Sequence, residues 1–117
     1  MTASENMAHA EDVTIFTPHP GTHKKYGYTE EEWRAGMEAQ GWVCGACGLR
    51  PKSGRLNYDH QHVRGWKAMP PEERKKYVRG WLCYMCNTHT LSRGATVAKL
   101  RGAADYLERY EERRDAN

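Results

Sequence analysis

Apolar positions recur at helical spacing in two parts of the chain. In the first part, Trp33 and Met37 share one helix face. Thr29 and Glu32 precede them as a capping box, in which each side chain bonds the backbone N–H of the other. Gly41 suits the end of such a helix, because glycine readily adopts the left-handed conformation found there. The pattern predicts a helix between Thr29 and Gly41.

The second periodic stretch lies near the end of the sequence and predicts a helix over residues 96–113. Its apolar positions are Val97, Leu100, Ala104 and Leu107. The last turns, ERYEERRD, are charged all round, which favours a solvated surface over a functional one.

Strand and turn signals separate these two stretches. Residues 56–63, LNYDHQHV, have the character of one strand of a hairpin. Residues 70–78, PPEERKKYV, predict a short helix with proline in its first turn. Together the elements predict a small α+β fold at residues 25–113, with 114–117 as a tail. Residues 1–24 are predicted to form a flexible arm, because proline and glycine interrupt any pattern there.

The composition narrows the class of protein. The chain has 117 residues, of which 38% are hydrophobic, and a domain this small and polar often needs a structural metal. No apolar run is long enough to span a membrane, and the N-terminus lacks the features of a signal peptide. We therefore expect a cytoplasmic protein, in which thiols stay reduced and cysteines serve as metal ligands before disulfides.

Four cysteines form two Cys-x-x-Cys pairs, Cys44/Cys47 and Cys83/Cys86. Two such turns complete a tetrahedron of thiolates, which suits a structural zinc ion. A thioredoxin-like redox motif would need only one pair, whereas an iron–sulfur cluster also takes four thiolates and stays an alternative. Zinc held by four sulfurs has no open coordination position. The acidic and histidine side chains between the pairs are therefore free for other chemistry.

The charge is distributed unevenly along the chain. The net charge is +3, yet residues 50–101 hold twelve basic and three acidic side chains. Such a segment favours a polyanionic partner such as DNA, although a merely solvated basic surface is the alternative. The residues predicted to contact phosphates are Arg64, Lys67, Arg74, Lys75, Lys76, Arg79 and Arg93. Trp66 and Trp81 lie among them as candidates for stacking on bases or for the core, and the core is favoured for Trp81.

The stretch Asp59-His60-Gln61-His62 lies between the two cysteine pairs. On a regular strand, His60 and His62 would share one face and Asp59 the other. A twist or bulge at Asp59-His60 would bring both to one cavity. The alternative is a hairpin in which these polar residues are incidental.

The ordered set of Cys44/Cys47, Asp59-His60, His62, Arg79-Gly80 and Cys83/Cys86-Asn87 resembles the recombination endonuclease VII family of phages, within the HNH or ββα-metal nucleases. The resemblance covers residues 24–110 and implies an HNH core with a zinc site, flanked by helices. It implies that Asp59 and Asn87 hold a divalent cation, with Mg²⁺ expected because that ion prefers oxygen ligands. It also implies that His60 is the general base and that His62 binds the phosphate or the metal. Branched DNA is the implied substrate, a homodimer the implied assembly and the host cytoplasm the location.

Two departures from the family pattern stand out. Residues 63–78 form an insertion between His62 and Arg79, expected as a loop or basic helix. No acidic residue lies between Glu73 and Asp105, so no catalytic glutamate follows Asn87, and His89 is a candidate for that place or a plain surface residue. A non-catalytic zinc-stabilised DNA-binding protein, a general HNH nicking enzyme and a zinc module that binds protein are the alternatives.

Overall fold

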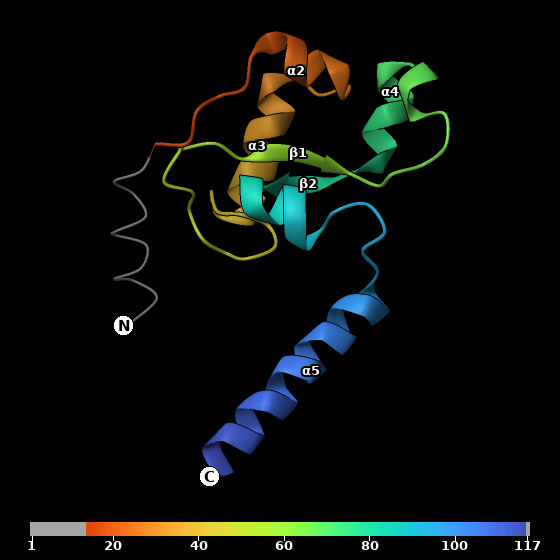
Figure 1. The fold of residues 1–117 in the computed structure, drawn as a ribbon. Coiled ribbons are helices and arrows are strands. Elements are labelled where there is room, and N and C mark those ends of the chain that lie inside the picture. Colours follow the sequence, from red (N-terminus) through yellow and green to blue (C-terminus); the bar gives the residue numbers. More distant parts are fainter. Residues whose placement is uncertain (1–13, 117) are drawn as a thin grey trace.

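The computed structural model describes residues 14–116 of the chain (Figure 1). At its centre lies a two-stranded antiparallel sheet, and helix α3 packs against it. The helices and strands are α2 (Pro20–Lys25), α3 (Glu30–Gln40), β1 (Asn57–His60), η1 (Trp66–Ala68), α4 (Pro71–Arg74), η2 (Lys75–Tyr77), β2 (Val78–Leu82), η3 (Cys86–Thr90) and α5 (Val97–Ala116). The predicted small α+β fold is confirmed at this level.

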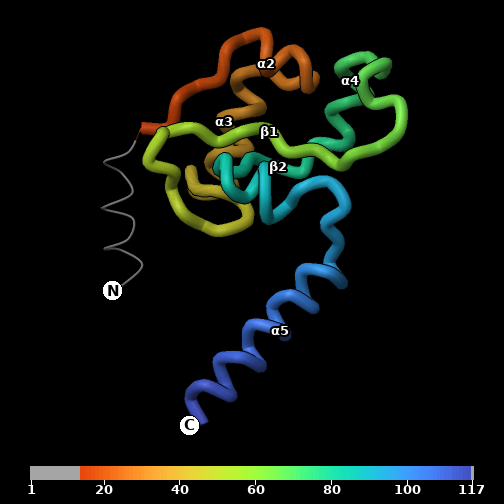
Figure 2. The backbone as a smooth tube through the Cα atoms, in the orientation of Figure 1, coloured from red at the N-terminus to blue at the C-terminus, as the bar shows by residue number. Residues whose placement is uncertain are grey.

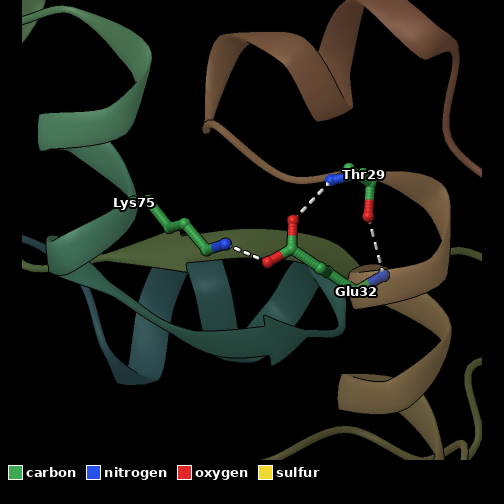
Figure 3. A network of polar contacts seen from close by, with 3 residues as sticks. All are labelled: Thr29, Glu32 and Lys75. Carbon is green, nitrogen blue, oxygen red and sulfur yellow. Dashed lines mark hydrogen bonds and ion pairs between the residues drawn. The ribbon is translucent and has the colours of Figure 1, made fainter.

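Helix α3 begins with the predicted capping box (Figure 3). The Thr29 hydroxyl accepts a hydrogen bond from the Glu32 N–H at 3.1 Å, and the Glu32 carboxylate accepts one from the Thr29 N–H at 3.0 Å. The second oxygen of Glu32 pairs with Lys75, which ties the start of α3 to η2. Gly41 ends the helix in the left-handed conformation, with φ of 73°. Both predicted helix signals are therefore confirmed.

The end of α3 is joined to β2 through the side chain of Gln40. Its carboxamide accepts a hydrogen bond from the Trp81 N–H at 2.9 Å and donates to the Trp81 carbonyl at 3.0 Å. The approach is close, because a Cβ on Gly80 would lie 2.6 Å from the Gln40 oxygen. A Cβ on Gly36 would lie 2.4 Å from the Trp81 ring. Two glycines thus allow the helix and the strand to pack in direct contact.

The pairing of the two strands is irregular at Asp59 and His60, two of the candidate site residues. Tyr58 lies opposite Trp81 and Asp59 opposite Gly80, but His60 lies opposite Val78. The register therefore shifts between Asp59 and His60, where the sequence left room for a bulge. A bulge redirects the side chains that follow it.

Most of the buried apolar residues form one core between α3, the sheet and the cysteine turns. Trp33 and Met37 contribute from α3, and Trp81 is buried as predicted. The other members of this core are Ile15, Cys44, Leu56, Tyr58, Leu82 and Cys86.

Helix α2 was not predicted from the sequence. Residues 1–13 of the predicted flexible arm lie outside the described part of the chain, but Pro20–Lys25 is helical. Pro20 occupies the first turn, where proline is well tolerated, and His19 caps the helix by accepting a hydrogen bond from the Gly21 N–H. His23 is buried against Tyr58, with 2.6 Å between its Nδ1 and the tyrosine oxygen, and burial lowers the pKa of His23. The sequence contains no signal for this helix, because its stability depends on contacts distant in sequence.

The segment 63–78 folds back onto the body of the protein. Its predicted short helix is confirmed as α4, with proline in the first turn. Arg74 donates hydrogen bonds to the carbonyl groups of Lys25, Trp66 and Lys67, at 3.1, 3.3 and 2.7 Å. Arg74 therefore ties this segment to α2 and is not a free phosphate contact.

Helix α5 points away from the body (Figure 2). It covers the predicted stretch, yet none of its residues is buried. Val97, Tyr106 and Leu107 are each more than 60% exposed. Within residues 14–116, no helix is both long and apolar enough to cross a membrane.

Replacement of Gln40 tests the joint between α3 and β2. Gln40→Ala leaves the Trp81 N–H without its partner and removes one of the two donors to the Trp81 carbonyl, which keeps the Gly45 N–H. We therefore expect the free energy of unfolding to fall by about 1–3 kcal/mol. Urea denaturation of the metal-loaded protein measures this change. Glu38→Ala, an exposed change on the same helix, is the control and should have almost no effect. Equal stability of the two variants would contradict the proposed joint.

Candidate functional site

The four cysteines come together at one end of the sheet. Cys44 and Cys47 lie in the turn after α3, and Cys83 and Cys86 follow β2. Their sulfur atoms all lie within 4.8 Å of one another, and none forms a disulfide. The Gly45 N–H donates to the Trp81 carbonyl at 3.0 Å, which fixes the first turn against β2. The predicted convergence of the two pairs is confirmed.

The geometry and protonation of this cluster suit a cation. With metal–sulfur bonds of about 2.3 Å, the sulfur atoms of a tetrahedral zinc site lie roughly 3.8 Å apart. The Cys47 and Cys83 sulfurs are 3.9 Å apart. Burial favours the neutral Cys44 thiol, but hydrogen bonds from backbone N–H groups lower its pKa to about 6. Burial and contacts with the other thiols raise the pKa of Cys86 to about 12. These four cysteines can bind a metal such as zinc, which would take the place of the remaining protons.

Asp59 is buried on β1 and forms an ion pair with Arg79 on β2. The Arg79 Nε and one terminal nitrogen donate to the two carboxylate oxygens, at 2.8 and 3.0 Å. Asp59 is only 5% exposed, so this two-point pairing balances a charge that burial would otherwise make costly. From the sequence, we expected Asp59 to bind a cation and Arg79 to contact DNA. The contact between these two residues was not expected.

His60 lies just past the bulge, stacked between aromatic rings. Its ring is 4.1 Å from that of Trp66, at an angle of 15°, and 5.0 Å from that of His62. Burial and the neighbouring His62 lower the pKa of His60. At neutral pH the imidazole is therefore uncharged and able to accept a proton.

Trp66 also contacts residues other than His60. Arg74 lies over the indole ring, 4.8 Å from its centre, and Tyr26 tilts against it at 5.6 Å. Trp66 thus links His60 to the inserted segment. The sequence treated this tryptophan as a candidate for stacking on bases, but it is buried beside a histidine. The tetrapeptide VRGW occurs twice in the sequence, at residues 63–66 and 78–81. Its two tryptophans, Trp66 and Trp81, are both buried.

Asn87 lies in η3, a π-helix that directly follows the second cysteine pair. The Asn87 N–H donates to the Cys83 carbonyl at 2.9 Å, and the Leu91 N–H donates to the Cys86 carbonyl. π-Helical turns often occur at functional sites. The Asn87 side chain lines a cavity together with Asn57 and Tyr58, the two residues that precede Asp59. His60 and His62 thus contact each other. Asn87 shares the lining of the cavity with the start of β1.

Apart from Arg74 and Arg79, whose contacts are given above, the predicted phosphate contacts fall into two groups. Arg64, Lys67 and Arg93 are exposed. Lys75 pairs with Glu32, and Lys76 pairs with Glu73 at 3.0 Å. Ion pairs of this exposed kind contribute at most about 1 kcal/mol, so a phosphate could displace the carboxylate.

Comparison with known proteins identifies the family. A family model described as recombination endonuclease VII matches residues 21–109. This chain belongs to the recombination endonuclease VII family. It is 37% identical over 86 residues to the Gene 59 protein of Mycobacterium phage D29. The aligned residues cover 72% of this chain and 46% of that protein. The chain therefore spans about half the length of that relative. No solved structure matches it significantly.

The resemblance that Asp59-His60 and Cys86-Asn87 suggested is confirmed for the family. Residues 21–109 include both cysteine pairs, the bulged strand and η3. The matched region thus contains every candidate site residue described above, from Cys44 to Arg93.

The metal content of the purified protein tests the cysteine site. We expect one zinc ion per chain by elemental analysis, and thiolate charge-transfer absorption after replacement by Co²⁺. Cys47→Ser should lose the metal and much of the fold, because a structural zinc contributes its binding energy to folding. Ala46→Ser, in the same turn, is the control. Iron with a visible cluster absorption in place of zinc would contradict the assignment.

The contact between Trp66 and His60 can be measured directly. Trp66→Leu should lower the free energy of unfolding by roughly 2–4 kcal/mol through lost packing. It should also move the ring-proton NMR signals of His60 downfield, because the ring current of the stacked indole is lost. Trp66→Phe retains an aromatic ring and should shift these signals less. Unchanged His60 signals in Trp66→Leu would show that the two rings are not stacked in solution.

Proposed function

We propose that this chain is an HNH-type, metal-dependent DNA endonuclease that hydrolyses phosphodiester bonds in branched or distorted DNA. The bulge between Asp59 and His60 is the observation that supports it most. Asp59 lies in a buried, charged environment, whereas His60 next to it lies in an aromatic one. Two neighbouring groups with opposite surroundings suit a division of roles between binding a cation and accepting a proton.

His60 would act as the general base. Burial lowers its pKa, so its ring is neutral at pH 7, and the stack on Trp66 restricts its rotation. A positioned imidazole can take the proton from a water molecule as that water attacks phosphorus. His62 is exposed beside it and would contact the phosphate that is cleaved.

Asp59 and Asn87 would hold the divalent cation. A carboxylate offers about four acceptor positions, and Arg79 uses only two of those on Asp59, so this carboxylate keeps positions for such an ion. Carboxylate and carboxamide oxygens are the ligands that Mg²⁺ prefers. When bound, the ion would stabilise negative charge on the phosphate and on the leaving oxygen.

The cysteine cluster would serve as the scaffold of this centre. Structural zinc would fix Cys86, and the bond from the Asn87 N–H to the Cys83 carbonyl would hold the next residue in place. The same cluster would fix the end of β2. Arg79, near the start of this strand, pairs with Asp59.

DNA would be held mainly through its phosphates. Arg64, Lys67, Lys75, Lys76, Arg79 and Arg93 are the proposed contacts, and such contacts position a protein without reading sequence. Arg79 has further N–H donors beyond the two used on Asp59. Selectivity for distorted DNA then has to come from shape. The exposed apolar side chains of α5 support the expected homodimer, which could cut two strands of a junction together.

A second candidate is a non-catalytic, zinc-stabilised DNA-binding protein. The Arg79 pair favours it, because the charge of Asp59 is balanced without any cation. In that case Asp59 would hold the strands together and would have no role at the phosphate.

Cleavage of labelled DNA decides between the two. Zinc-loaded protein is mixed with a four-way junction or a matched linear duplex, each with Mg²⁺ or with EDTA. We expect nicking only with Mg²⁺ and mainly of the junction. His60→Ala should reduce the rate by roughly 10²–10⁴-fold, the usual contribution of a general base.

Gln61→Ala serves as the matched control, because Gln61 is the exposed residue between the two histidines. It should cut like the unmodified protein, and the zinc content of all three proteins must be equal. Binding of the junction without cleavage in Mg²⁺, Mn²⁺ or Ni²⁺ would overturn the endonuclease and favour the binding protein.

A further inference from the structure

A cavity of about 660 Å³ lies next to the proposed active site. One wall comes from residues 16–19 and from α2, another from the start of β1, and a third from η3. Its volume falls within the usual range of small-molecule sites. The active site described above uses only Asn87 from this cavity, so the remainder of its lining has no role so far.

The lining combines aromatic rings with carboxamides. Phe16, Tyr26, Tyr58 and Tyr84 supply the rings, and Asn57 and Asn87 supply the amides. Among residues 14–116, no carboxylate lines the cavity, and Arg55 provides a positive charge. Aromatic faces stack on nucleobases, amides bond their polar edges, and an arginine suits the attached phosphate.

The ring faces that are free to stack can be identified. Tyr26 and Tyr58 lie parallel with 4.4 Å between their centres, so each already covers one face of the other. Tyr84 is 65% exposed and Phe16 is 59% exposed. These two residues, from segments far apart in the sequence, therefore offer the accessible aromatic surface.

We propose that this cavity receives an unpaired base of the DNA substrate, from a nucleotide adjacent to the cleaved bond. The inference rests on the proposed endonuclease function. Asn57 lines the cavity and lies two residues before Asp59 on β1, on the same face of the strand, and Asn87 belongs both to the cavity and to the proposed cation site. A base held there would thus lie beside the reacting phosphate.

This site gives a physical reason for selectivity toward distorted DNA. A base must leave its stack to enter the cavity, and this costs least when it is mismatched, bulged or single-stranded. A continuous duplex would have to supply that free energy, whereas a junction or loop offers bases that are already unpaired. Selectivity for DNA shape then needs no reading of base sequence.

Binding to three DNA probes, measured by fluorescence anisotropy without Mg²⁺, tests the proposal apart from cleavage. The probes are a duplex with one bulged thymine, the same duplex with an abasic bulge, and the fully paired duplex. We expect the thymine bulge to bind about 10-fold more tightly than the abasic bulge, as expected for one stacked base. Tyr84→Ala should abolish that difference, whereas Tyr84→Phe, which keeps the ring, should retain it.

Met85→Ala is the matched control, because Met85 directly follows Tyr84, is 60% exposed and lies outside the cavity lining. It should leave the preference intact. Equal affinity of the unmodified protein for both bulges, or an equal loss on all three probes in Tyr84→Ala, would overturn the base site. A protein that prefers the thymine bulge but never cuts would keep the base site and refute the nuclease. A protein that cuts junctions without preferring the thymine bulge would keep the nuclease and refute the base site.

Discussion

The convergence of four thiol groups within 4.8 Å is the constraint on which the rest of the structure depends. Thirty-five residues, 48–82, separate the two cysteine pairs, so bringing the pairs together closes a long loop at a cost in chain entropy. Thiolates at this distance repel one another unless a cation lies among them. A bound metal would therefore supply both the charge and the free energy that hold the two halves of the chain together.

Contacts around the cysteines carry this constraint to the strands. Gln40 and Gly45 both bond the backbone of Trp81, which fixes β2 beside the first cysteine turn. β1 pairs with β2, and the shift in register sends Asp59 toward Arg79 and His60 toward Trp66. On the other side, Asn87 follows Cys86 without an intervening residue. The candidate site residues therefore lie on or beside the paired strands and the second cysteine turn.

The sequence predicted the features that depend on local rules. The capping box of Thr29 and Glu32, the glycine that ends α3 and the proline in the first turn of α4 are each determined by neighbours within a few residues. The cysteine pairs were also predictable, since their spacing has few uses in a reduced protein. The family could be inferred from the order of Asp59-His60 and Cys86-Asn87, which the comparison with known proteins confirmed.

Features set by distant contacts could not be predicted from the sequence. Helix α2 has six residues, too few to be stable alone, and depends on burying His23 against Tyr58. Arg79 and Arg74 look like surface charges in the sequence, yet one pairs with Asp59 and the other bonds three carbonyl groups. For α5, the apolar spacing gave a helix but not its surroundings, and it is exposed along its length.

The central claim is that β1 and η3 together hold a divalent cation at Asp59 and Asn87. Anomalous diffraction from crystals of the zinc-loaded protein soaked in Mn²⁺ tests this claim most directly. The account predicts an anomalous peak within bonding distance of both side chains, with Arg79 withdrawn from at least one oxygen of Asp59. No peak at Asp59, with both Arg79 contacts intact in crystals that take up Mn²⁺ elsewhere, would contradict it.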